Sequence, residues 1–494
     1  MRWLLLVFST CLFAQPASLA TKANQAKQFM AQGKFADAAK LYAELAKVLP
    51  SNGGLVLNHG LALHMSGQDK AAIPVLEKSL KLNPQQPPAM LFLGASYLRT
   101  GNPAKAIPYL EKFLPLDPRN LEARRMAVDA YEMTGQSAKA LPHWEALADA
   151  EPKNPGVLYG LGRSWEAYAA ASFAELDRRF PESAPFFALL GDTRSRANQR
   201  RVAYYLYREA LKKDPAFPGL HAALAEIYRL EGQPQWALAA EAEAAKLPAP
   251  DCANLAAKPA CQFAQGNFQS ALAAARRQDS ALGLYWRIKA ANEIARLTFL
   301  RLEAAGPSPE LYRFQAEELR QQGRAKDAVE AWRSARRLEP ENPQWTRELA
   351  ITLFEAKEYT EADKLCSALL AQASQDPQLL HLAGDIQLAQ QLTDRAIPLL
   401  EKAAAADPKN LAARSSLARA LMQAGRPADA LPHATAALPL DQDGSLHFQL
   451  ARAYQSAGLA EDAKRTMAIY QQIRARLRAQ DQALEQEVQI APLP

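Results

Sequence analysis

The sequence predicts an all-α protein built as a solenoid of antiparallel helix pairs. Three residue types recur at one spacing of 34 residues, which fits a helix-turn-helix unit. The recurring residues are Pro50, Pro84, Pro118 and Pro152, then Gly33, Gly67, Gly101 and Gly135, and also Ala38, Ala72, Ala106 and Ala140. Units of this kind stack without a single central core, so a chain of 494 residues fits one long array.

Each recurring position has a physical role. The glycine marks the turn between two helices, where it allows a positive φ or a close approach of the backbone at little cost. The alanine lets the second helix pack closely, and a bulky residue follows four positions later on the same face. These bulky residues are Tyr42, Leu76, Leu110 and Trp144. The proline ends the unit because it cannot continue a helix.

This pattern resembles the tetratricopeptide repeat. That family places a small residue three positions before a large one in the first helix, as Gly60 precedes Leu63 and Gly94 precedes Tyr97 here. Later units, such as the one running from Gly384 to Pro408, fit the same pattern. The resemblance implies a right-handed superhelical solenoid of about a dozen repeats.

Seven segments are expected along the chain. A leader (1–20) precedes a regular array (21–154) and an irregular block (155–247) that begins with one overlong helix. A degenerate repeat with two cysteines (248–280) separates this block from a second copy (281–372), because Leu158, Phe173 and Pro181 match Leu284, Phe299 and Pro307 at a step of 126 residues. Further repeats (373–460) and a polar capping helix with a tail (461–494) follow.

Residues 1–20 have the features of a signal peptide. Arg2 precedes an apolar stretch, and Ser18 and Ala20 are the small residues that a signal peptidase requires, so cleavage is expected after Ala20. The alternatives are lipidation at Cys11, for which Thr10 is a poor neighbour, and a buried first helix of the fold. Cleavage predicts an exported, periplasmic protein with no transmembrane segment in its mature form.

Three cysteines remain after the leader. In an oxidising compartment, Cys252 and Cys261 are candidates for a local disulfide. The alternative is two unpaired packing cysteines. Cys366 takes the place of the bulky residue in its repeat and is expected to be buried.

No motif in the sequence indicates catalysis. There is no nucleophile elbow, phosphate-binding loop or metal-binding histidine pair, so we expect no enzyme activity, no cofactor and no metal. The net charge of +6 is spread along the chain, which does not indicate nucleic-acid binding. The basic, tyrosine-containing segment from Arg194 to Lys213 could bind nucleic acid or an acidic protein. Packing is favoured, because Tyr207 falls on the bulky position of the repeat.

The resemblance implies a protein-binding scaffold that holds a peptide or protein in a concave groove lined by the first helix of each pair. The positions expected to face this groove are Leu57, Leu61, His64, Met65, Leu91, Leu98, Arg99, Arg125, Asp129 and Met133. The alternative is a helper subunit of an envelope enzyme or of a polysaccharide export system, binding sugar through groove aromatics. The identity of the partner does not follow from the sequence.

Overall fold

The computed structural model describes residues 14–248, 250–254, 258–487 and 489–493, without the side chains of 14–18 and 480–487. These residues form 26 α-helices and one short 3-10 helix, which confirms the all-α prediction. The first 13 residues of the predicted leader lie outside the described part, and residues 14–20 belong to the first helix.

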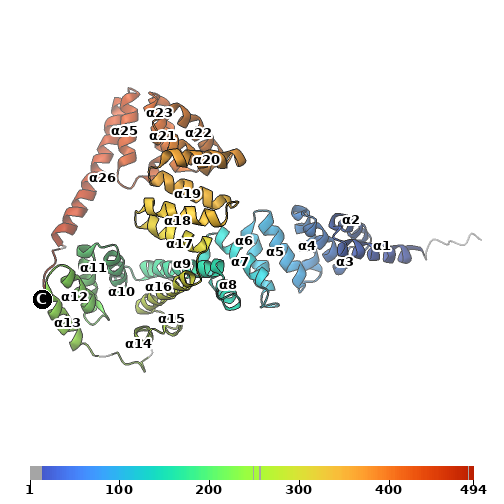
Figure 1. Cartoon of the computed structure of the whole chain (residues 1–494), viewed down its shortest axis with the longest axis horizontal. Coiled ribbons are helices and arrows are strands. Elements are labelled where there is room, and N and C mark those ends of the chain that lie inside the picture. The colour runs from blue at the N-terminus through green and yellow to red at the C-terminus, as the bar shows by residue number, and fades with distance from the viewer. Residues whose placement is uncertain (1–13, 249, 255–257, 488, 494) are drawn as a thin grey trace, which may run out of the picture. The chain divides into compact units, whose positions relative to one another are not determined.

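The helices belong to two compact units. One comprises the chain up to Ala174 together with Arg287–Arg301, and the other comprises Glu175–Trp286 and the chain from Leu302 onward. The first unit contains α1 (Ala14–Ala31), α2 (Phe35–Val48), α3 (Gly53–Met65), α4 (Asp69–Leu82), α5 (Pro87–Arg99), α6 (Pro103–Phe113), α7 (Leu121–Met133) and α8 (Ser137–Ala150). Figure 1 shows that these helices follow one another in a single row of pairs.

Two long helices, α9 (Pro155–Arg179) and α16 (Ala281–Ala304), contribute residues to both units. The second unit contains α10 (Ala184–Arg196), α11 (Arg200–Lys213), α12 (Leu220–Leu230), α13 (Pro234–Lys246), α14 (Lys258–Ala264), α15 (Phe268–Ala275), α17 (Pro309–Gln321), α18 (Ala325–Leu338), α19 (Pro343–Glu355), α20 (Tyr359–Gln372), α21 (Pro377–Ala389), α22 (Thr393–Ala406), α23 (Leu411–Gln423), α24 (Pro427–Ala437), η1 (Leu438–Leu440), α25 (Ser445–Ser456) and α26 (Ala460–Glu487).

The turns between paired helices have the expected backbone. Gly33, Gly67, Gly101 and Gly135 have φ values of 72°, 78°, 72° and 68°. Three repeats form the same turn with another residue in the left-handed conformation: Asn198, Lys357 and Gln391. The turn is therefore imposed by the packing of the two helices, and glycine only makes it less strained.

The core of the second and third regular repeats contains a contact between a glycine of the first helix and a leucine of the second. A methyl group on Gly60 would lie 2.5 Å from Leu76 Cδ2, and one on Gly94 would lie 2.8 Å from Leu110 Cδ2. Both leucines are fully buried, as are the recurring alanines. Close approach of the two helices at the glycine therefore buries the leucine of the second helix.

Trp144 does not occupy the buried place that the repeat predicts for it. The position opposite in α7 is Val128, so the indole has no glycine to pack against in its own repeat. Its ring lies instead against Gly160 of α9, where a methyl group would come within 2.2 Å of Cζ2. Trp144 is half-buried, and its Nε1 donates to Glu132 Oε1 at 3.3 Å.

The helices α9 and α16 are the two overlong helices expected from the duplicated block, with 25 and 24 residues. Matched positions are equally buried, because Leu158 and Leu284 are 1% exposed and Leu176 and Leu302 are 0% exposed. The two helices also contact each other within the first unit. Gly162 of α9 lies against the ring of Phe299 of α16, and the Arg163 guanidinium lies 5.4 Å from the centre of that ring.

The predicted polar helix near the end of the sequence is α26, with 28 residues. It packs on α25, where Tyr470 contacts Phe448 with ring centres 5.3 Å apart. Among the helices that the structure describes, none has the length and apolar character needed to cross a membrane.

Candidate functional site

The predicted groove residues lie on α3, α5 and α7, the first helices of three successive repeats. The contacts of α5 with both α3 and α7 make these helices one continuous layer. The predicted positions recur in register, since Leu57, Leu91 and Arg125 occupy one position and Met65, Arg99 and Met133 another. We call the surface formed by these residues the first-helix surface.

This surface combines apolar and charged groups. Met65 and Met133 are 45% and 60% exposed. The leucines of the set (Leu57, Leu61, Leu91 and Leu98) are half-buried against the core of the first repeats. A flexible methionine with a leucine behind it adapts to ligand shapes, which is a property of surfaces that bind peptides.

The charges at one end of the surface interact with one another. Arg125 Nη2 lies 2.5 Å from Glu151 Oε1, and Asn154 donates to the other carboxylate oxygen at 2.6 Å. The Arg125 hydrogen bond lowers the pKa of Glu151 below its ordinary value. Desolvation raises the pKa of Asp129, and the Arg125 charge opposes that shift. An anionic ligand group would compete with Glu151 for Arg125.

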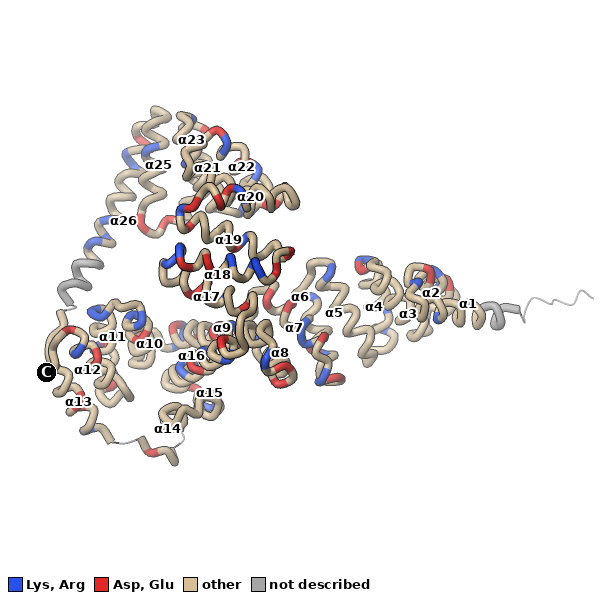
Figure 2. The backbone as a smooth tube through the Cα atoms, in the orientation of Figure 1, with Lys and Arg blue, Asp and Glu red and all other residues tan. Residues whose placement is uncertain are grey.

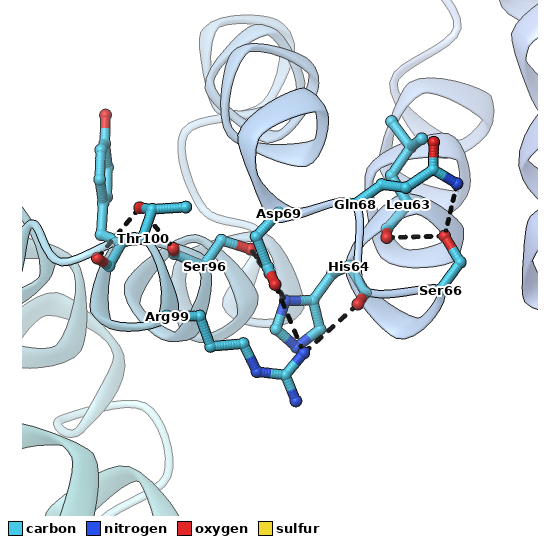
Figure 3. A network of polar contacts seen from close by, with 9 residues as sticks. Leu63, His64, Ser66, Gln68, Asp69, Ser96, Arg99 and Thr100 are labelled. Carbon is cyan, nitrogen blue, oxygen red and sulfur yellow. Dashed lines mark hydrogen bonds and ion pairs between the residues drawn. The ribbon is translucent and has the colours of Figure 1, made fainter. Parts of the chain in front are cut away.

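His64 departs from the prediction, because it is buried and not available at the surface. The residue is 4% exposed, and its Nδ1 lies 2.6 Å from Asp69 Oδ1 and 2.8 Å from Ser96 Oγ (Figure 3). Ser96 Oγ donates to the same Asp69 oxygen at 2.9 Å. The three residues come from α4, α3 and α5, so the network joins one repeat to the next.

The His64 network contains the residue types of a hydrolase triad but not its geometry. In a triad, the serine and the carboxylate bond opposite ring nitrogens, whereas here both approach Nδ1. The Ser96 side chain is fully buried and donates to Asp69, so no base activates it. Desolvation lowers the pKa of His64, and Asp69 partly offsets that shift. The arrangement is a structural junction.

The junction holds one residue of the first-helix surface in place. Arg99 Nη1 lies 3.4 Å from the His64 carbonyl oxygen and 3.6 Å from Asp69 Oδ2 (Figure 3). Arg99 itself is exposed. His64 and Asp69 therefore position the Arg99 guanidinium, and only Arg99 can meet a ligand.

The tyrosines of α5 and α7 point into the repeat. Tyr97 donates to Glu77 at 2.5 Å and Tyr131 donates to Glu111 at 2.7 Å, and both rings are buried. Their hydroxyls are thus occupied within the fold. This placement does not favour a sugar site built from these two tyrosines.

Cys252 and Cys261 are joined by a disulfide with a Cα–Cα distance of 5.8 Å. It closes the segment between α13 and α14, where prolines interrupt the helical pattern.

Cys366 is a buried free thiol, and burial raises its pKa to about 12. Among the described residues, no group of His, Cys, Asp or Glu side chains could hold a metal ion.

Positive and negative residues are both scattered over the helices of each unit, among longer uncharged stretches (Figure 2). In the basic segment noted in the sequence, Lys212 pairs with Glu209 and Arg200 pairs with Glu231. Tyr207 is buried on its repeat, and its hydroxyl donates to Asp192 at 2.9 Å. Tyr207 therefore packs within its repeat, as the register of the sequence predicts.

Comparison with protein families identifies the fold. Two family profiles, both described as tetratricopeptide repeat, match residues 24–87, 70–120, 91–155 and 315–377 in one case and 387–446 in the other. Together they cover just over half of the sequence, and the chain belongs to the tetratricopeptide repeat family. Comparison with curated proteins gives no match.

Several solved structures are similar over parts of the array. MamA MSR-1 is 24% identical over 34% of this chain and 97% of its own, with a TM-score of 0.30. MamA 41-end from Desulfovibrio magneticus RS-1 is 18% identical over 40% of this chain and 97% of its own, with a TM-score of 0.28. A thermophilic TPR protein in Thermus thermophilus is 16% identical over 36% of this chain and 98% of its own, with a TM-score of 0.30.

Proposed function

We propose that this protein is a non-catalytic scaffold that holds a peptide or protein partner on the first-helix surface. Proteins of the tetratricopeptide repeat family generally serve protein–protein interaction. The observation that supports this site is the recurrence of exposed Met65, Arg99 and Met133 at one position of three successive first helices, above a layer of half-buried leucines. Apolar anchors next to charged groups suit an amphipathic partner segment.

The experiment is an affinity capture from envelope extracts with quantitative mass spectrometry. The test variant carries Met65→Glu and Met133→Glu, which place charge where an apolar anchor would bind. The matched control is Leu82→Glu, because Leu82 is 40% exposed on α4, a second helix. We expect the test variant to lose partners that the native chain and the control both retain. Identical partner sets for all three proteins would reject the surface.

We further propose that the protein is exported to the periplasm. The features that support this are Arg2 and the apolar stretch of the leader, together with a disulfide that needs an oxidising compartment. N-terminal sequencing of protein from cell fractions should find Thr21 as the first residue in the periplasmic fraction. Intact Met1 in the cytoplasmic fraction would contradict export.

A further inference from the structure

A short segment near the end of the sequence lies on the second unit. Residues Gln489–Leu493 follow α26 and run beside α12 and α13, where Figure 1 marks the C-terminal end. Tyr204 of α11 and Tyr228 of α12 both bond to this segment. Their side chains are 1% and 0% exposed.

The two tyrosines bind the backbone of a single residue, Ala491. The Tyr204 hydroxyl donates to the Ala491 carbonyl at 2.8 Å and accepts from the Ala491 N–H at 3.1 Å. The Tyr228 hydroxyl donates to the same carbonyl at 2.7 Å. Both backbone groups of Ala491 are therefore satisfied, as they would be beside a neighbouring β-strand.

Neighbouring side chains also contact the two tyrosines. Arg208 Nη1 donates to the Tyr204 hydroxyl at 3.2 Å, and this bond completes the one donor and two acceptor sites of that hydroxyl. The ring of Tyr228 packs edge-on against Tyr204 and Trp236, with ring centres 5.9 and 5.7 Å away. Burial raises the pKa of Tyr228, so its hydroxyl stays protonated and donates.

The side chains of the segment add an apolar preference. Ile490 and Leu493 are half-buried, and Pro492 biases Ala491 toward extended geometry. Leu493 lines a pocket of about 410 Å³ together with Leu211, Leu247 and Pro215. Some of the charged groups at the rim form ion pairs, such as Lys246 with Glu243 at 2.6 Å. The apolar part of the lining suits an apolar side chain, and Arg208, Lys212 and Lys246 make the pocket unfavourable for a cationic one.

We propose that this tyrosine site, formed by Tyr204, Arg208, Tyr228 and the pocket around Leu211, binds extended, proline-containing apolar peptide segments. Its resident occupant is the 489–493 segment of the same chain. A ligand of this class has to displace that segment first. The site lies mainly on α11 and α13, which are second helices, and α12 contributes Tyr228 and His221. It is separate from the first-helix surface and does not depend on the function proposed there.

Occupancy by a tethered segment should weaken binding of a free peptide. A segment on the same chain competes at an effective concentration on the order of millimolar, which reduces the apparent affinity of a free competitor. Release of the segment would also remove the Ala491 carbonyl that accepts from both buried hydroxyls, and that cost favours the occupied state.

The test uses a fluorescently labelled peptide with the sequence of residues 486–494 and the full-length chain. In the vacated variant, Ala491→Pro removes the N–H that donates to Tyr204, and Leu493→Lys places a positive charge beside Arg208, Lys212 and Lys246. Fluorescence anisotropy should show the peptide binding the vacated variant about tenfold or more tightly than it binds the native chain.

Substitutions in the vacated variant then test the hydrogen bonds. Tyr204→Phe should weaken peptide binding by at least about fivefold, because it removes the bonds to both backbone groups of Ala491. The matched control is Tyr207→Phe, since Tyr207 lies on the same helix but donates to Asp192, and it should leave binding unchanged. Thermal melts of each variant verify folding.

Three outcomes would overturn the proposal. Equal peptide binding by the native and vacated chains would show that the segment does not occupy the site. Equal effects of Tyr204→Phe and Tyr207→Phe would show that the hydroxyl does not bind the backbone. If the native chain is a dimer and the vacated variant is a monomer, the segment that occupies the site comes from a second copy of the chain.

Discussion

The regular repeats of the first unit and the α10–α13 repeats of the second unit share a type of core contact. They differ in the groups that accept hydrogen bonds from their tyrosine hydroxyls. In both, a large side chain of the second helix packs against a glycine of the first helix. Leu110 packs against Gly94, and Tyr207 packs against Gly191. The hydroxyls of Tyr97 and Tyr131 bond to glutamates 20 residues away. Those of Tyr204 and Tyr228 bond to a residue 287 and 263 positions away.

This difference determines how far a perturbation should spread. A repeat whose groups are satisfied by its neighbours loses stability only locally, because the energy of a solenoid is summed over adjacent units. The α10–α13 repeats depend also on a segment far along the chain. We therefore expect local responses in the regular array and long-range coupling in α10–α13.

The largest expected effect is that of Leu110→Ala. Leu110 is fully buried against Gly94, so its truncation should cost about 3–5 kcal/mol in the free energy of unfolding. Hydrogen exchange with mass spectrometry should show lost protection in α5, α6 and α7 and unchanged protection in α11 and α12. The control Leu82→Ala, at an exposed position, should have little effect. Lost protection in α11 would contradict the local character of the regular array.

Removal of the disulfide should have the next largest effect. Replacing Cys252 and Cys261 together by serine reopens a loop of about ten residues, which is worth about 2–3 kcal/mol in the chain-entropy model. Chemical denaturation should show the loss in the transition that includes α13 and α14. A reducing agent should produce the same shift in the native chain and none in the double variant. Non-reducing peptide mapping that finds two free thiols would contradict the bond.

Trp144→Ala should cost less than Leu110→Ala, although the repeat pattern assigns both residues to the same position. Trp144 is half-buried, so we expect about 2 kcal/mol, roughly half the value for a fully buried tryptophan. The indole also packs against Gly160 of α9, and its loss should broaden the unfolding transition by weakening the contact between neighbouring repeats. A cost equal to that of Leu110→Ala would show that the indole is as deeply buried as the leucine.

The smallest effect concerns pH. Desolvation lowers the pKa of His64 below 6.5, so the unfolded chain binds more protons than the folded chain as the pH falls below that value. The stability contributed by neutral His64 is therefore present above pH 6.5 and is lost as the pH falls through the folded pKa. His64→Asn keeps a donor for Asp69 but does not titrate. Denaturation at several pH values should show a weaker acid dependence for this variant than for the native chain.

Much of the fold could be predicted from the sequence because its determinants are local and periodic. A 34-residue spacing of proline, glycine and alanine specifies where helices end, turn and pack, and the structure places Pro50, Gly67 and Ala72 accordingly. Turns at Lys357 and Gln391 carried no such signal, because their left-handed backbone is imposed by the helices on either side.

The candidate sites were predictable only in part. Register alone placed Met65, Arg99 and Met133 at one position of successive first helices. It could not show that His64 turns inward, because this depends on Asp69 and Ser96, which come from two other helices. The tyrosine-rich segment near Tyr204 was visible in the sequence, but its partner was not.

The sequence by itself determined the class of fold, the helix pairs, the turn glycines and the long helices of the duplicated block. All of these depend on residues within one or two repeats of each other. Only the tertiary structure decided the inward turn of His64, the placement of Trp144 against α9, the contact of Gly162 with Phe299 and the seating of Ala491 on Tyr204 and Tyr228. Those contacts depend on side chains that meet across helices or from distant parts of the chain, and a periodic pattern carries no information about such pairs.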